Sequence, residues 1–234
     1  MSSRSLFRCS LVVMLLLLVA CGGEDTSLSS KPSLRILALG DSYTIGEGVG
    51  RSESWPFQLV AALSSDSLTV VQPTVVAATG WTTSDLLQAI AQAALDPPYD
   101  IVTLLIGVND QFQGYSVEAY TTGFETLLER AISFARSDPT RVIILSIPDY
   151  TLTPFGRVNS PANSANALSR FNTINREIAT NCGVTYVDIT PISRLVSGDP
   201  ELIALDDLHP SGKMYSLWVR ELLPVVRPIL RGSI

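Results

Sequence analysis

Short apolar runs recur along the chain, rich in β-branched residues and bounded by Gly or Pro. They cover residues 34–39, 68–77, 101–106, 141–147 and 184–189. The apolar positions are nearly continuous and do not alternate with polar ones, which predicts strands that are buried on both faces.

Longer segments with apolar positions three and four apart lie between these runs and predict helices. They cover residues 84–95, 117–136, 165–181 and 212–231. Pro224 and Pro228 lie inside the last segment, and we expect them to kink or break that helix. Repeated alternation of strand and helix predicts a parallel sheet with helices on both faces. In such a sheet ligands bind beyond the carboxyl ends of the strands, so the candidate chemistry is sought there.

The first residues of the chain are typical of a targeting segment. Arg4 and Arg8 precede an unbroken apolar run at 11–20, which as a helix would cover about 15 Å, half of a bilayer core. This length favours a signal peptide over a membrane span. The run ends Leu18-Val19-Ala20-Cys21, which resembles the bacterial lipobox, whose Cys becomes the lipidated first residue of the mature chain.

This pattern predicts a signal peptide at 1–20, a lipidated polar tether at 21–33 with Cys21 as the lipidation site, and one domain at 34–232. The expected location is the bacterial cell envelope, with the protein held at a membrane by its lipid anchor. The alternative is an ordinary secretory signal followed by a coincidental Cys.

Composition narrows the possible chemistry. With 46% hydrophobic and 16% charged residues, the chain is not a disordered polyelectrolyte. The 22 acidic residues outnumber the 16 basic ones, which gives no electrostatic footprint for nucleic acid. One His and three Cys are too few soft ligands for a zinc cluster, so we expect no metal. Unless a cofactor supplies the chemistry, it must rest on oxygen nucleophiles, carboxylates and the single imidazole, and we expect no cofactor. Cys182, near the end of a predicted helix, is expected to be a small buried apolar residue.

Polar residues that carry chemistry follow the predicted strands. Residues 40–43 read Gly-Asp-Ser-Tyr after the first strand, and residues 107–110 read Gly-Val-Asn-Asp after the third. Residues 206–210, just before the last helix, read Asp-Asp-Leu-His-Pro. Each stretch alone is weak evidence, because Gly, Asp, Asn and Ser are ordinary turn formers.

Taken together, these stretches resemble the SGNH hydrolases, also called the GDSL esterase and lipase family. Residues 38–43 match its first block, with Tyr43 where the family name has Leu, and residues 79–81 fit a block built around one Gly. Residues 107–110 and 206–209 match the Gly-x-Asn-Asp and Asp-x-x-His blocks. The resemblance implies an α/β fold, a flavodoxin-like three-layer α/β/α sandwich with a mostly parallel five-stranded sheet. It also implies ester hydrolysis through an acyl-enzyme.

By this resemblance Ser42 is the nucleophile, and His209, the only imidazole in the chain, is its base. The oxyanion hole would consist of the backbone N–H groups of Ser42 and Gly80 and the side-chain amide of Asn109. Asp206 would accept the second ring N–H of His209 and fix its tautomer.

Adjacent acidic residues compete for this last role. Asp206 is three residues before His209 and would share its face of a helical-type turn, whereas Asp207 would face elsewhere. Pro210 is expected to hold His209 at the exit of that turn. The alternative is that a backbone carbonyl orients His209 and that neither acid matters. Asp41 and Asp110 are expected to brace loops rather than to react.

Five aromatic residues lie just past predicted strand ends and are candidates for the acyl pocket: Trp81, Phe112, Tyr115, Tyr150 and Phe155. Apolar lining is usual for small-molecule sites. The alternative is ordinary packing of the loops.

The cluster Gly46-Glu47-Gly48-Val49-Gly50 follows the first strand. Its glycines come too late and have the wrong final spacing for a dinucleotide fingerprint. We expect a flexible loop over the active site.

The expected activity is hydrolysis of a lipid or small-molecule acyl ester. Residues 146–150 and the Val-Asn-Asp-Gln run resemble bacterial members that are labelled lysophospholipase-like. The alternatives are a carbohydrate O-acetyl esterase acting on cell-envelope or plant polysaccharide and a non-catalytic envelope-binding lipoprotein. The intact set of Ser42, Asn109, Asp206 and His209 argues against the latter.

Overall fold

Parallel strands form the centre of the fold in the computed structural model, which describes residues 33–65 and 68–232. The strands are β1 (Ile36–Asp41), β2 (Thr74–Ala78), β3 (Ile101–Leu105), β4 (Val142–Leu145) and β5 (Thr185–Val187). They form one five-stranded sheet in the order β2-β1-β3-β4-β5, and every ladder in it is parallel. This is the flavodoxin-like strand order, and it confirms the predicted sheet.

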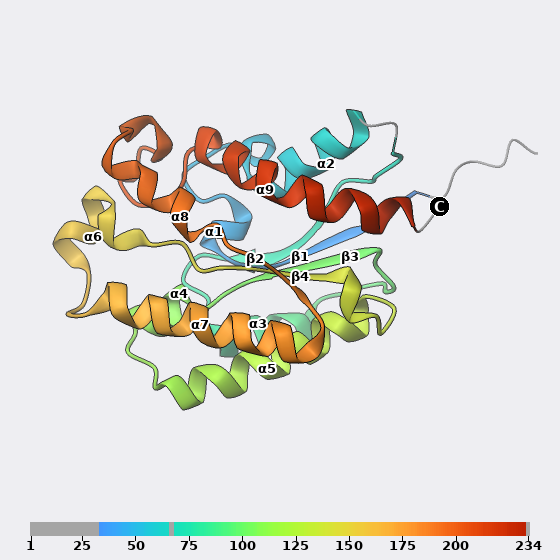
Figure 1. Ribbon diagram of the computed structural model, residues 1–234, viewed down its shortest axis with the longest axis horizontal. Helices are drawn as coiled ribbons and strands as arrows, with labels where there is room; N and C mark the ends of the chain where they lie inside the picture. Colours follow the sequence, from blue (N-terminus) through green and yellow to red (C-terminus); the bar gives the residue numbers. More distant parts are fainter. Residues whose placement is uncertain (1–32, 66–67, 233–234) are drawn as a thin grey trace, which may run out of the picture. The chain divides into compact units, whose positions relative to one another are not determined.

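Helices cover both faces of the sheet. The α-helices are α1 (Ser42–Ile45), α2 (Trp55–Ser65), α3 (Thr83–Gln92), α4 (Val108–Phe112), α5 (Val117–Phe134), α6 (Pro154–Asn159), α7 (Ser164–Cys182), α8 (Thr190–Ser193) and α9 (Gly212–Arg231). Short 3₁₀ turns lie at Arg51–Glu53, Pro139–Arg141, Tyr150–Leu152, Arg194–Ser197 and Pro200–Leu202. Helices α2 and α9 lie on one face, and α3, α5 and α7 lie on the other (Figure 1). The predicted three-layer sandwich is confirmed.

Burial along the strands follows their place in the sheet. Every residue of β1, β3 and β4 is buried, whereas the edge strands β2 and β5 are partly exposed. Central strands covered on both faces require nearly continuous apolar sequence. A fully buried Leu, such as Leu37, contributes about 1.5–3 kcal/mol relative to an exposed one.

The predicted strand at 68–77 is wrong over its first half. Only Thr74–Ala78 joins the sheet, and Val70 makes an isolated bridge to Leu34. Pro73 separates the two pieces, and because proline has no backbone donor it interrupts the ladder.

Helix α2 has no counterpart among the predicted elements. Its sequence, WPFQLVAALSS, is apolar at most positions and therefore shows no clear amphipathic period. Pro56, at its second position, is typical of a helix start and would have indicated it.

Helix α9 runs from Gly212 to Arg231 without a break, although Pro224 and Pro228 lie inside it. The two prolines are four residues apart, and both are exposed. On the solvent side the carbonyl groups that lose a donor can bond to water, so the helix continues past both prolines.

Cys182 is the last residue of α7 and is exposed, so the expectation of a buried thiol is wrong. The helix end was predicted, but the exposed face on which the side chain lies was not.

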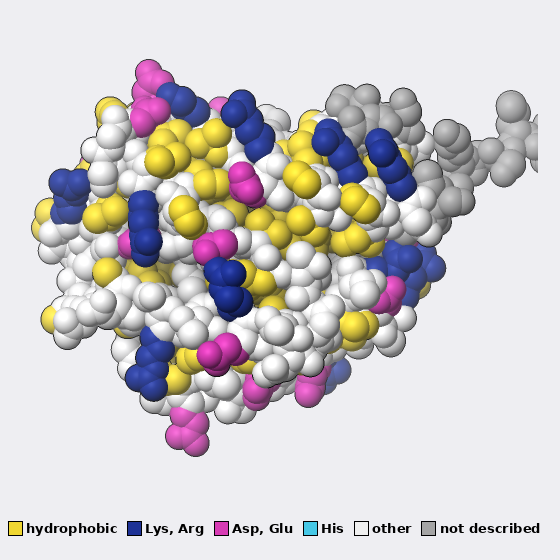
Figure 2. Space-filling view, in the orientation of Figure 1, with side chains coloured by type: hydrophobic (Ala, Val, Ile, Leu, Met, Phe, Trp, Pro, Cys, Tyr) yellow, Lys and Arg dark blue, Asp and Glu magenta, His cyan; other side chains and the backbone are white. Residues whose placement is uncertain are grey.

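On the face drawn in Figure 2, acidic and basic side chains are interspersed among neutral and apolar groups.

The predicted signal peptide, Cys21 and all but the last residue of the 21–33 tether lie outside the described residues. Within 33–65 and 68–232, no helix is both long and apolar enough to span a bilayer.

Candidate active site

Two segments far apart in sequence bring Ser42, His209 and Asp206 into one hydrogen-bonded chain. Ser42 begins α1 directly after β1, and His209 lies in the loop before α9. The Ser42 Oγ lies 3.0 Å from the His209 Nε2, and the His209 Nδ1 lies 2.6 Å from the Asp206 Oδ2. Ser42 and His209 are 4% and 7% exposed, so both are largely shielded from water, whereas the Asp206 side chain is 33% exposed.

Asp206 forms a tight turn around the histidine. Its Oδ1 accepts hydrogen bonds from the backbone N–H groups of Leu208, at 3.0 Å, and His209, at 2.9 Å. Burial raises the pKa of Asp206, but these N–H groups and the imidazole outweigh it and hold the pKa below its ordinary value. Asp206 is therefore the ionised partner of the imidazole near neutral pH.

The predicted choice between the adjacent acids agrees with this geometry, but the predicted turn does not. Asp207 has a φ of 63°, so the segment is not helical. Asp206 reaches His209 through a turn that its own side chain stabilises. Asp side chains commonly bind backbone N–H groups a few residues further along the chain, and the prediction from helical spacing did not take this into account. The backbone carbonyl of Asp207 instead accepts a hydrogen bond from Phe155, at 3.0 Å.

Asp41 is the last residue of β1, directly before Ser42, and is fully buried. Its Oδ1 accepts a hydrogen bond from the Tyr43 N–H at 3.0 Å and so caps α1. Its Oδ2 has no hydrogen-bond partner among the described residues. Burial raises the pKa of Asp41 from 3.8 to about 8, with a smaller contribution from the nearby Asp110. Asp41 therefore has the geometry of a structural residue that holds the start of α1, as expected from the sequence.

Gly80 and Asn109 line the same pocket as Ser42. Gly80 follows β2 with a φ of 79°, a conformation that favours glycine. The Asn109 Nδ2 donates a hydrogen bond to the Trp81 carbonyl at 2.9 Å. A primary amide has two N–H groups, so one remains for a ligand.

Asp110 fixes the start of α3 against α4. Its buried carboxylate accepts hydrogen bonds from the Thr83 N–H, at 3.0 Å, and the Thr83 Oγ, at 2.6 Å. Burial raises the pKa of Asp110, although the bonds from Thr83 oppose the shift. This side chain therefore also has the geometry of a brace.

A pocket of about 150 Å³ opens beside the Ser42 hydroxyl. Its lining consists of Ser42, Tyr43, Thr79, Gly80, Val108, Asn109, Phe112, Tyr150, Phe155, Leu208 and His209. Phe112, Tyr150 and Phe155 lie where the aromatic candidates were expected. Trp81 and Tyr115 do not line this pocket: Trp81 provides the carbonyl that Asn109 binds, and Tyr115 borders a separate depression beside α7.

Sequence reasoning missed four residues of the lining: Tyr43, Thr79, Val108 and Leu208. Each is inside or directly next to one of the four sequence blocks. Their position in these blocks could have indicated that they line the pocket, because short loops at strand ends leave little room for neighbouring side chains to face elsewhere.

The aromatic wall of the pocket is held in place from behind. The Tyr150 hydroxyl lies 2.9 Å from the Gln111 Oε1 and 3.2 Å from the Ser164 Oγ. The ring of Phe112 packs against those of Tyr150 and Phe155, with centroids 6.0 and 6.5 Å apart. The wall is therefore a fixed surface, except that Phe112 is 40% exposed at the mouth.

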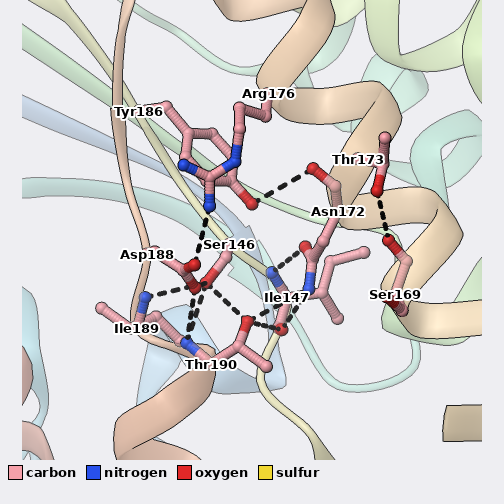
Figure 3. Close-up of polar contacts among 10 residues, drawn as sticks. All are labelled: Ser146, Ile147, Ser169, Asn172, Thr173, Arg176, Tyr186, Asp188, Ile189 and Thr190. Atoms are coloured by element: carbon pink, nitrogen blue, oxygen red, sulfur yellow. Dashed lines mark hydrogen bonds and ion pairs between the residues drawn. The ribbon is translucent and has the colours of Figure 1, made fainter.

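A polar network holds the chain where β4 ends and the loop to Tyr150 begins (Figure 3). Asn172 of α7 bonds both backbone groups of Ile147, at 2.7 and 2.9 Å. The Ser146 Oγ accepts from the backbone N–H of Thr190 at 2.9 Å and donates to Asp188 at 3.0 Å. These bonds join β4, β5 and α7 just before the segment that carries Tyr150.

Residues 38–217 match the GDSL-like Lipase/Acylhydrolase family. The chain belongs to this family. Its members are carboxylic ester hydrolases of the GDSL or SGNH type, so the predicted family is confirmed.

Known relatives agree with this membership. An arylesterase from Vibrio mimicus is 28% identical over 129 residues, which are 53% of this chain and 61% of that protein. The match therefore spans less than two thirds of the relative.

Solved structures share the fold at lower identity. The acetylxylan esterase Axe2 from Geobacillus stearothermophilus superposes with a TM-score of 0.65 at 17% identity, covering 82% of this chain and 94% of that one. The psychrotrophic esterase EstA from Pseudoalteromonas sp., solved with monoethylphosphonate as inhibitor, gives 0.62 at 18%, covering 84% and 98%.

The buried Asp41 predicts a pH dependence of stability. Because its pKa is raised to about 8 from 3.8, the folded state keeps a proton that the unfolded state releases. The contribution of Asp41 to the free energy of unfolding should fall as the pH rises from about 4 to about 8. Above about pH 8 this contribution should not change further. Asp41→Asn keeps an acceptor for the Tyr43 N–H but cannot ionise. In urea titrations, the free energy of unfolding of the variant should rise relative to that of the wild type between about pH 4 and pH 8. A difference between the two proteins that does not depend on pH would contradict the raised pKa of Asp41.

Proposed function

We propose that this protein is a serine esterase that hydrolyses short acyl esters through an acyl-enzyme intermediate. The observation that supports it is the chain from Ser42 through His209 to Asp206, which opens into a small apolar pocket. A hydroxyl is a weak nucleophile unless an adjacent base removes its proton, and this geometry provides that base.

In the proposed acylation step, the Ser42 Oγ attacks the ester carbonyl while the His209 Nε2 takes its proton. Asp206 accepts the Nδ1–H, which fixes the tautomer and stabilises the imidazolium as it forms. The imidazolium then protonates the leaving alcohol. In deacylation water replaces Ser42 as the nucleophile, and the same imidazole again acts as base and then as acid.

The negative charge on the tetrahedral intermediate needs donors that are already in position. The proposed donors are the backbone N–H groups of Ser42 and Gly80 and the free N–H of the Asn109 amide. Gly80 has no other heavy atom within 4 Å of its would-be Cβ, so an ester oxygen can approach its backbone. Loss of one such donor typically costs about 10²- to 10³-fold in kcat.

The size of the pocket favours a short acyl group. Its volume of about 150 Å³ is below the roughly 300–1,000 Å³ of drug-sized ligand sites. The side chains of Val108, Tyr150 and Phe155 give it an apolar wall that suits an alkyl group. A long-chain lysophospholipid would have to leave most of its acyl chain outside this wall, so we place that substrate second to short esters.

A carbohydrate O-acetyl esterase is the second candidate, because acetyl is an acyl group that this pocket fits. The two candidates differ in the alcohol: a small or aromatic alcohol in one and a sugar hydroxyl in the other. The shared fold of Axe2 agrees with either activity.

The proposed triad predicts unequal effects of the adjacent acids. Asp206→Asn should lower kcat by about 10²- to 10⁴-fold through loss of the tautomer lock, whereas its matched control Asp207→Asn should cost less than about tenfold. Ser42→Ala and His209→Ala should each cost about 10³- to 10⁶-fold, and the double variant little more.

The readouts for these variants are kcat over pH 5–9 and mass-spectrometric mapping of a serine-directed phosphonate. Full turnover by Ser42→Ala, or labelling at another residue, would sink the esterase proposal. If the wild-type protein turned over none of the esters tested, this result would favour the non-catalytic alternative.

The pocket predicts a dependence on acyl length. Among p-nitrophenyl acetate, butyrate, octanoate and palmitate, kcat/KM should be highest for the first two and at least about tenfold lower for the last two. Phe155→Ala should shift the preference towards longer chains, and Tyr115→Ala, an aromatic residue outside the pocket, should not. Acetate release from acetylated xylan or peptidoglycan at a higher kcat/KM would favour the carbohydrate esterase, and preferred turnover of lysophosphatidylcholine would contradict the short acyl pocket.

We also propose that the mature chain is lipidated on Cys21 and held in the bacterial cell envelope, which rests on the Leu-Val-Ala-Cys sequence at the end of the leader. Two or three acyl chains anchor a protein stably, whereas one binds only marginally. Cys21→Ser should therefore move the protein from the membrane to the soluble fraction with ester turnover unchanged, and Cys182→Ser should leave it in place. An unlipidated mature N-terminus in the mass spectrum would refute the anchor.

A further inference from the structure

The glycine-rich loop at residues 46–50 joins three parts of the candidate site. The Glu47 N–H donates to the Ser42 carbonyl at 3.0 Å. The Glu47 carboxylate accepts a hydrogen bond from the Thr79 hydroxyl. A Cβ on Gly48 would lie 2.9 Å from the Asp206 Oδ2, so the loop backbone packs directly against the acid. The loop thus contacts the nucleophile turn, the Thr79–Gly80 turn and the loop of His209.

The contact with Thr79 lies next to the proposed oxyanion donor at Gly80. The N–H of Gly80 belongs to the peptide group that links Thr79 to Gly80, so the conformation of both residues sets its direction. Gly80 has a φ of 79°, and nothing packs within 4 Å of its would-be Cβ. Because glycine adopts many conformations, this peptide needs support from its neighbours.

The support after Gly80 comes from α4. Asn109 donates to the Trp81 carbonyl at 2.9 Å, and Asp110 binds the backbone N–H and hydroxyl of Thr83. These bonds fix the chain on the α3 side of the turn.

The support before Gly80 is different. The ladder between β1 and β2 ends with Asp41 opposite Ala78, one residue before Thr79. Thr79 itself is exposed, and the hydrogen bond from its side chain goes to Glu47. Across the turn itself the Trp81 N–H donates to the Ala78 carbonyl at 3.4 Å, and in the described part of the chain the bond to Glu47 is the hydrogen bond that the Thr79 side chain makes.

We propose that Glu47 is a positioning residue for the oxyanion hole: its hydrogen bond to Thr79 fixes the peptide whose N–H is aimed at the developing oxyanion. This inference rests on the proposed esterase function. It assigns the effect to the hydrogen bond and not to the carboxylate charge, because a negative charge near the oxyanion would oppose catalysis. An acceptor without charge should therefore serve as well.

The test is a double-mutant cycle on this pair. Glu47→Ala should lower kcat for p-nitrophenyl acetate by about 10- to 100-fold with KM within about twofold, since the loss falls on the transition state. Thr79→Val should lower kcat by a similar factor, and the double variant should lose no more than the worse single variant. Glu47→Gln, which keeps a side-chain oxygen acceptor, should retain kcat within about threefold.

Glu53→Gln is the matched control. Glu53 is an exposed carboxylate that binds the N–H of Gly50 at 3.1 Å, at the far end of the same loop, and its change should leave kcat unaltered. Inactivation by the phosphonate should slow in Glu47→Ala by about the same factor as kcat, because both reactions place charge on the same oxygen. If changes in this loop acted by loosening the fold in general, they would lower the thermal unfolding midpoint, and the changes at Glu47 and at Glu53 would both lower kcat.

The outcomes separate this inference from the function on which it rests. If Ser42→Ala retains full turnover, the esterase proposal fails. If Ser42→Ala is inactive but Glu47→Ala matches the wild type, or the two losses add, the positioning role is refuted and the esterase stands. Equal losses in Glu47→Gln and Glu47→Ala would also refute the hydrogen-bond route. Should Glu47→Ala not fold, Thr79→Val must still lose activity and Glu47→Gln must still keep it.

Discussion

The parallel register of β1 between β2 and β3 is the constraint on which the site depends. Asp41 lies opposite Ala78 on one side, and Gly40 lies opposite Leu105 on the other. The three strands therefore end at the same level, and the turns that follow them begin side by side. This places Ser42, Gly80 and Asn109 around one pocket although they are far apart in the sequence. A shift of register by one residue would separate the hydroxyl from both candidate donors, since side chains alternate between the two faces of a sheet.

The environments of three carboxyl groups around this level differ in a way that separates their roles. Burial raises the pKa values of Asp41 and Asp110, whereas hydrogen bonds from the His209 loop outweigh burial and lower the pKa of Asp206. The acid that faces the imidazole is thus the one held as an anion. In the proposed mechanism, a second anion at the end of β1 would compete with Asp206 for the positive charge that develops on His209. A raised pKa disfavours such a second anion, and in either protonation state the Asp41 Oδ1 can accept the hydrogen bond that caps α1.

Much of the fold could be predicted because buried parallel strands leave a continuous apolar pattern that needs no knowledge of their partners. The candidate triad could be predicted because its residues lie in short blocks directly after strands. The walls of the pocket could not, since whether Trp81 or Phe155 faces it depends on how α3 and α6 pack. The same holds for Cys182, whose exposure depends on which face of α7 its last turn presents. Helix α2 was missed because an almost uniformly apolar segment lacks the periodicity that distinguishes a helix from a strand.

Chemistry and specificity come from different parts of the chain. The proposed nucleophile and oxyanion donors follow β1, β2 and β3, and the imidazole precedes α9. The aromatic wall comes mainly from the segment after β4. Asn172, Ser146 and Thr190 hold the start of this segment, and farther along the Phe155 N–H donates to the Asp207 carbonyl in the His209 loop at 3.0 Å. That contact is made by the backbone, so side chains in the segment can change in size while the link to the His209 loop is kept. Such a separation lets one catalytic arrangement serve esters of different acyl groups, and it explains why the motifs reveal the reaction while the substrate has to be inferred from the volume of the pocket.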